Sequence, residues 1–163
     1  MAALRRAFRG RWRSERGAEF VEFALAFPLL LLVVMGIMDF GIMFQQYEVL
    51  TNAAREGARV AVLPDYCPNP ATCDANVSAR VNAYIGASFL AVGGTVTVNP
   101  VTITPVPVGA NCMNTVTVTL SFPHQYLFLG GIMNYFGGSF TSRTLNASSS
   151  MRSEVPLVAC PGP

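Results

Sequence analysis

Two carboxylates, Glu19 and Glu22, stand at the start of an apolar run that is otherwise suited to lipid. A carboxylate in that place can be the anionic half of an ion pair. If the chain began at Ala18, its α-amine and the Glu22 carboxylate would lie about 6 Å apart along a helix, which is one turn. A neighbouring helix displaced by one turn would then present its amine to Glu22, and a paired charge in a low-dielectric setting is preferable to two lone ones. The alternative is a carboxylate that rests at the membrane interface, near the partly positive N-terminus of a helix.

Other groups that could perform chemistry are sparse. The single histidine, His124, stands between Pro123 and Gln125 at the end of an expected strand, where we predict a surface or packing role. The sequence contains no nucleophile elbow, no zinc-protease motif and no phosphate-binding loop. We therefore expect no catalytic residue, cofactor, metal or small-molecule substrate, and a membrane-tethered enzyme is the weakest of the hypotheses.

The charges are few and unevenly placed. Charged residues make up 12% of the 163 residues, against roughly 25% in soluble proteins. Residues 1–17 form a basic leader that precedes the apolar run directly, which predicts a cytoplasmic leader and an extracytoplasmic remainder by the positive-inside rule. No other basic patch supports nucleic-acid binding. The arginines of the leader are Arg5, Arg6, Arg9, Arg11, Arg13 and Arg16.

The apolar run is long enough to cross a bilayer only if it includes one acid. Residues 23–38 carry no charge but reach only about 24 Å as a helix, whereas an extension to Phe44 reaches about 33 Å and takes in Asp39. We expect Asp39 near the outer boundary, where a charge costs less. A cleaved secretory signal would show small residues after the apolar core, and here they are bulky. A twin-arginine signal is weakly suggested by Arg5 and Arg6, but nothing downstream looks like a cofactor-carrying passenger.

The entrance of this run resembles a known processing site. Arg16 and Gly17, followed by Glu22 and Phe23 and then the apolar run, are similar to the cleavage region of class III (Flp-type) type IV prepilins. The resemblance implies that a membrane prepilin peptidase cuts after Gly17 and that the mature chain begins at Ala18. It also implies that Glu22 is the fifth-position glutamate used in subunit assembly.

A second resemblance lies further along the same helix, which we expect over residues 20–62 because Pro64 stops it. The stretch "AAREGARVA" at residues 53–61 is similar to the segment that follows the membrane helix in TadE-like proteins of the tight-adherence pilus system. Its small residues would allow close approach, either by the protein's own domain or by another subunit. We expect Glu56 and Arg59 to form an exposed ion pair. The family stretch comprises Ala54, Arg55, Glu56, Gly57, Ala58 and Arg59.

Together the two resemblances imply a minor pilin, or pseudopilin, that takes part in assembly or initiation of a tight-adherence type IV pilus. Its implied partners are other pilins, pilus assembly proteins, the prepilin peptidase and the lipid bilayer. The implied location is the bacterial inner membrane with the C-terminal domain in the periplasm, or the pilus and cell surface after assembly. The alternative function is an uncleaved single-pass scaffold whose periplasmic domain binds pilus or secretion machinery.

We expect an α+β fold in four parts: a leader at 1–17, a transmembrane helix at 18–44, an extension of that helix at 45–64 and an extracytoplasmic domain at 65–163. A second helix, capped by Asp74, should end at Gly93. An antiparallel sheet should follow, with strands near Thr95, Val101 and Thr115 and a last strand within residues 140–151. Pro105 and Pro107 should confine the second strand to an edge. The expected inner face of the helix comprises Val77, Val81, Tyr84, Ile85, Phe89 and Val92.

Two features of this domain leave alternatives. The four cysteines fall on the periplasmic side, where disulfides form. We favour pairing Cys67 with Cys73 and Cys112 with Cys160; a zinc site is the poorer alternative, because the spacings do not fit one. The segment "YLFLGGIMNYF" at residues 126–136 carries no charge. It is either core, which we favour, or an exposed contact surface.

Overall fold

The computed structural model describes residues 15–88, 94–109, 111–135, 137, 142–153 and 158–159. Its dominant element is α2 (Glu15–Ala61), a continuous helix of 47 residues that is about 70 Å long. The predicted long helix is confirmed, and its end at Ala61 agrees with the expected stop before Pro64. Most of the leader lies outside the described residues.

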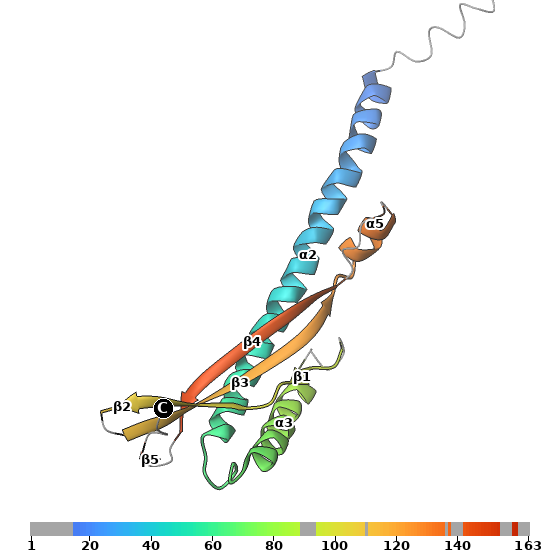
Figure 1. The fold of residues 1–163 in the computed structure, drawn as a ribbon. Helices are drawn as coiled ribbons and strands as arrows, with labels where there is room; N and C mark the ends of the chain where they lie inside the picture. The colour runs from blue at the N-terminus through green and yellow to red at the C-terminus, as the bar shows by residue number, and fades with distance from the viewer. Residues whose placement is uncertain are drawn as a thin grey trace, which may run out of the picture.

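The two halves of α2 have different surroundings. The end that begins at Glu15 stands apart from the rest of the chain, and the end that finishes at Ala61 crosses the domain (Figure 1). Residues 17–34 are all exposed, whereas Leu50, Ala53, Ala54 and Ala58 are fully buried. The helix is long and apolar enough to cross a membrane. One half is therefore a stem that the domain leaves uncovered, and the other half is the centre of the core.

The second helix, α3 (Pro70–Gly86), packs against the buried half of α2. Asn69 caps it by accepting a hydrogen bond from the Thr72 N–H at 2.9 Å, and Pro70 follows at the first helical position, where no N–H is needed. The prediction that Asp74 caps this helix is wrong, because the Asn-Pro pair starts it earlier. Asp74 instead accepts from the Val101 N–H at 2.8 Å and ties the sheet to the helix.

The inner face of α3 is largely as predicted. Val77, Val81 and Ile85 are buried, whereas Tyr84 is 39% exposed. The helix ends at Gly86, earlier than the expected end at Gly93. That residue lies outside the described residues, as do the other two predicted positions of this face, Phe89 and Val92.

The sheet is built around one long central strand, β3 (Asn111–Gln125). On one side it pairs with β1 (Thr97–Val98) and β2 (Thr102–Val108), and on the other with β4 (Ser142–Arg152) and β5 (Val158–Ala159), always antiparallel. The predicted strand alternation is confirmed, since the apolar side chains of β3 face the helices and the intervening threonines do not. Its buried residues include Val116, Val118, Leu120 and Phe122. The predicted α+β fold with an antiparallel sheet is confirmed.

The sheet edges and the end of the β3–β4 ribbon complete the fold. β2, which holds Pro105 and Pro107, is exposed along its length and is bonded to β3 alone among the described strands, as the prolines predicted. The β3–β4 ribbon continues along α2 beyond the core and leads to a short helix, α5 (Leu129–Tyr135), beside the apolar half of α2 (Figure 1).

Candidate functional site

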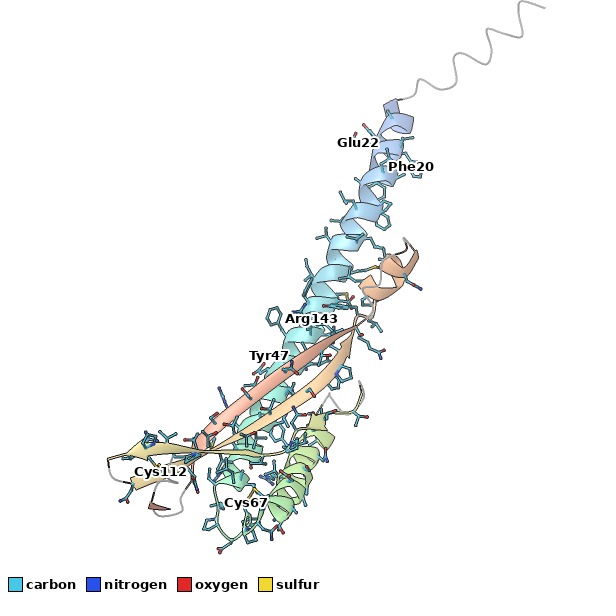
Figure 2. All side chains as sticks on the ribbon, in the orientation of Figure 1. Phe20, Glu22, Tyr47, Cys67, Cys112 and Arg143 are labelled. Atoms are coloured by element: carbon cyan, nitrogen blue, oxygen red, sulfur yellow. A yellow bond between two sulfur atoms is a disulfide. The ribbon has the colours of Figure 1, made fainter. Side chains whose placement is uncertain are left out.

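The predicted processing and assembly residues stand at the free end of the stem. Gly17, Ala18, Glu22 and Phe23 are all exposed, and Figure 2 shows Glu22 far from the domain. Glu22 has no ion-pair partner among the described residues. The helix places Ala18 one turn from Glu22, as the ion-pair hypothesis requires. The Glu22 carboxylate is therefore accessible to a partner outside the protein's own domain.

Asp39 behaves differently, because the domain surrounds it. Its side chain is only 1% exposed. The N–H groups of Leu127 and Phe128 each donate to it at 3.0 Å, and that of Leu129 donates at 2.7 Å. A carboxylate that accepts several backbone hydrogen bonds has exchanged its water shell for fixed dipoles. Asp39 thus fastens the start of α5 to the apolar part of α2.

Sequence reasoning placed Asp39 at a membrane boundary and gave it no partner. A weak signal was present, because Asp39, Gln46 and Leu50 lie at spacings of seven and four residues and so share one face of the helix. Leu50 is a core residue, which indicates that the same face continues under the domain at Asp39. The partner, by contrast, lies 88 to 90 residues away and no local pattern identifies it.

A buried polar contact lies next to this cap. His124 Nδ1 is 2.5 Å from Gln46 Oε1, and the Tyr126 ring meets the His124 ring edge-on with centroids 4.8 Å apart. Burial lowers the pKa of His124 below its usual value, and the negative charge of Asp39 partly opposes that shift. Of the two roles predicted for His124, surface or packing, its 1% exposure agrees with packing. The pair joins β3 to α2.

The apolar segment 126–136 is mostly not core, so the favoured prediction was wrong. Among its residues whose burial the structure describes, only Tyr126 and Gly130 are buried, and Leu127 is 70% exposed. The segment leaves the domain at the end of β3 and turns along the stem instead of entering the space between sheet and helices. There Leu129 meets an open apolar groove on α2, which is lined by Leu32, Val33, Gly36, Ile37, Phe40, Gly41 and Phe44.

The family stretch packs mainly on the protein's own domain. Ala54 and Ala58 are fully buried. A Cβ placed on Gly57 would lie 2.9 Å from Cγ2 of Val81 and 3.4 Å from Cγ1 of Val118. The small residues therefore let α3 and the sheet approach α2, which is the first of the two readings of this stretch. The expected Glu56–Arg59 pair is wrong.

The actual partner of Glu56 is Arg80 on α3, which donates to the Glu56 carboxylate from two of its guanidinium nitrogens. The packing of α3 on α2 brings Arg80 within reach, whereas Arg59 stays exposed at the next turn. The Arg80 side chain is 53% exposed, so we assign this ion pair no large stabilising effect.

One predicted disulfide can be described. Cys67 and Cys73 are joined, with their Cα atoms 4.2 Å apart. The bond closes the turn between α2 and the first turn of α3. Cys112 is buried in β3, and its predicted partner Cys160 lies outside the described residues, so that pairing stays a prediction. No group of three potential metal-ligating side chains occurs in the part of the chain that the structure describes.

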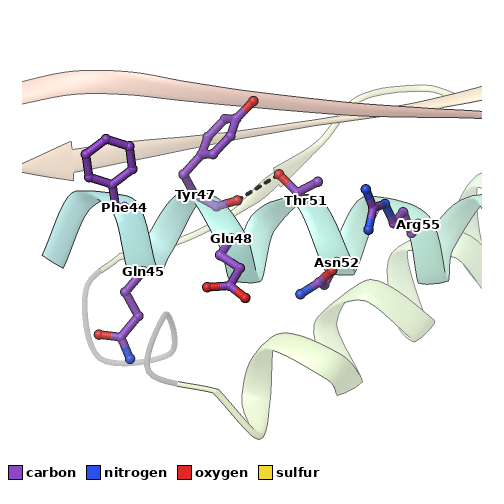
Figure 3. A pocket seen from close by; sticks show the side chains of 7 residues that line it. All are labelled: Phe44, Gln45, Tyr47, Glu48, Thr51, Asn52 and Arg55. Atoms are coloured by element: carbon purple, nitrogen blue, oxygen red, sulfur yellow. Dashed lines mark hydrogen bonds between the residues drawn. The ribbon is translucent and has the colours of Figure 1, made fainter. Parts of the chain in front are cut away.

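The outer face of α2 within the domain forms a shallow, open groove (Figure 3). It carries both charge signs, from Glu48 and Arg55, and an internal hydrogen bond from the Thr51 hydroxyl to the Tyr47 carbonyl at 2.8 Å. These side chains do not form an arrangement of nucleophile and base. The lining residues are Phe44, Gln45, Tyr47, Glu48, Thr51, Asn52 and Arg55.

A comparison with known protein families finds one similarity, which falls on α2. The model described as TadE-like protein matches residues 17–59, which cover α2 almost completely. This segment is TadE-like. The match includes the exposed stem and the family stretch but not α3 or the sheet, and no curated protein and no solved structure matches the chain. The similarity to TadE-like proteins therefore concerns α2 alone among the described elements.

Proposed function

We propose that this protein is a minor pilin, or pseudopilin, of a tight-adherence type IV pilus, which is cleaved after Gly17 and takes part in pilus assembly or initiation. One observation supports this proposal above the others. The TadE-like match falls on a helix whose residues 17–34 are mostly apolar and all exposed, and Glu22 near its free end has no ion-pair partner among the described residues. Such a stem needs either lipid or the stems of other subunits around it.

The charge distribution supports one orientation. The arginine-rich leader precedes the stem, so the N-terminus would remain in the cytoplasm. The domain would then lie in the periplasm, where the Cys67–Cys73 disulfide can form. Other pilins, pilus assembly proteins and the prepilin peptidase are the proposed partners.

Cleavage after Gly17 is compatible with the position of that residue. Gly17 lies in the first turn of α2, where backbone N–H groups have no partner within the helix. Unwinding one such turn to enter a protease cleft disturbs little of the structure, and a glycine has the conformational freedom to do so. The new amine at Ala18 would then be available to the Glu22 carboxylate of a neighbouring stem.

The processing step is tested by the N-terminal residue and intact mass of the protein recovered from membranes of a host that retains its pilus system. We expect an N-terminus at Ala18. Retention of Met1, or loss of that residue alone, would contradict cleavage and favour the second candidate, an uncleaved scaffold that acts through its periplasmic domain.

The assembly step is tested with Glu22→Ala, which removes the carboxylate but leaves the apolar surface. We expect normal membrane insertion and reduced co-purification with other pilins. Glu19→Ala is the matched control, because Glu19 is also an exposed carboxylate and lies about one turn away. If both variants co-purify with other pilins to the same extent as the wild-type protein does, a specific role for Glu22 is contradicted.

A further inference from the structure

The end of the β3–β4 ribbon, residues 126–135, is here named the tip. It reaches along α2 into the zone that the proposed function assigns to the bilayer. Leu129 lies in the same groove as Leu32 and Val33. Asp39 is bonded to the N–H of Leu129, and the groove that Leu129 enters extends from Phe44 past Asp39 to Leu32, so the tip lies beside the part of α2 that would be in the bilayer. Interfacial helices lie at depths of about 5–10 Å.

The tip also removes the obstacle to a full membrane span. Asp39 is the one charge between Phe23 and Phe44, and the tip covers its carboxylate to 1% exposure. The surface that α2 presents to its surroundings is therefore uncharged over residues 23–44, about 33 Å, which matches the hydrocarbon thickness of about 30 Å. Without the tip, the uncharged length would end before Asp39.

The polarity of the tip fits lipid and not water. It contains no charged residue and a single amide, Asn134. Leu127 is 70% exposed, although exposure of a leucine side chain to water is unfavourable. The N–H groups of Leu127, Phe128 and Leu129 all donate to Asp39, so the tip would enter the membrane with these three groups already paired.

A cationic side chain marks the level at which the apolar surface ends. Arg143 pairs with His124 across the β3–β4 ladder, and His124 contacts Gln46, just beyond Phe44 on α2. Arg143 is exposed and has no ion-pair partner in the part of the chain that the structure describes. Figure 2 shows it at the base of the tip. An arginine at this height can reach lipid phosphates.

We propose that the tip is a second membrane contact: residues 126–135 lie in the outer leaflet against α2, with Leu127 in the acyl region and Arg143 at the headgroups. The proposal rests on the membrane anchoring in the proposed function. In this arrangement α2 and the tip enter the bilayer as one unit, joined by Asp39, and the domain is held at a fixed height above the membrane.

The test uses single tryptophans in the full chain, in vesicles of phosphatidylethanolamine and phosphatidylglycerol with brominated acyl chains. The only native tryptophan, Trp12, is first changed to phenylalanine. The reporter is Leu127→Trp. The controls are Leu29→Trp in the middle of the stem and Tyr66→Trp at the opposite end of the domain; the replaced side chains are 70%, 68% and 53% exposed.

We expect the emission of Leu127→Trp to be blue-shifted and quenched by the brominated lipids almost as strongly as that of Leu29→Trp, while Tyr66→Trp is unaffected. Quenching at Leu29 without quenching at Leu127 would overturn the lipid-bound tip and leave the membrane anchor intact. Absence of quenching at Leu29 would overturn the anchor itself, and with it both proposals.

Discussion

Replacing Asp39 by alanine tests whether one carboxylate holds the tip against α2. The variant leaves the N–H groups of Leu127, Phe128 and Leu129 without their acceptor. Hydrogen bonds to a charged group contribute about 1.5–3 kcal/mol each, so three of them give an upper limit of roughly 4.5–9 kcal/mol. The tip is at the end of a ribbon. If it moves away from α2 in the variant, water can hydrogen-bond to the three N–H groups, which returns part of that free energy.

The expected global effect is therefore smaller than the sum. Loss of a helix N-cap typically costs about 0.5–2 kcal/mol, and we expect the free energy of unfolding of Asp39→Ala to fall by that order. The local effect should be larger. A loss of about 1.5–3 kcal/mol in local opening corresponds to roughly 10- to 100-fold faster amide exchange at Leu127, Phe128 and Leu129.

Hydrogen exchange followed by mass spectrometry, in the same detergent for every variant, measures this change on peptides that contain residues 126–130. Glu48→Ala is the matched control, because Glu48 is an exposed carboxylate on the same helix. Asp39→Asn keeps one acceptor oxygen and should give an intermediate rate. Unchanged exchange of the tip in Asp39→Ala, or equal acceleration in Glu48→Ala, would refute the assignment of Asp39 as the anchor.

Three further predictions concern the domain. Gly57→Ala places a Cβ within 2.9 Å of the buried Val81 and should lower the melting temperature, because overpacking costs about 1–3 kcal/mol and the better helix propensity of alanine offsets at most about 1 kcal/mol. The control Gly86→Ala has open space around the new Cβ and should not lower the melting temperature. Burial lowers the pKa of His124, so the unfolded chain binds more protons at this residue than the folded chain does. The free energy of unfolding should therefore decrease as pH falls below about 6.5, with a slope from His124 of at most about 1.4 kcal/mol per pH unit. His124→Gln should remove this contribution to the slope. Arg80→Ala, which breaks the pair with Glu56, should change stability by less than about 1 kcal/mol in denaturant titrations; a change of several kcal/mol would show that the pair holds α3 in place.

Local patterns predicted most of the elements. The long helix, the buried face of α3 and the alternation of Val116 and Val118 along β3 were all readable, because each depends on residues two to four positions apart. The edge position of β2 followed from Pro105, which has no N–H to donate. The helix start at Asn69 could also have been read from the Asn-Pro pair, but Asp74 was chosen in its place.

The sequence by itself determined that this protein has an arginine-rich N-terminal segment, an apolar helix with a glutamate near its start and a small α+β domain. It did so because composition and periodicity act over short distances. Only the tertiary structure decided what Asp39 does, that Glu56 pairs with Arg80, and that the tip lies on the stem instead of in the core. Each of those outcomes joins residues that are distant in the chain, and the packing of sheet and helices on α2 determines which of them meet.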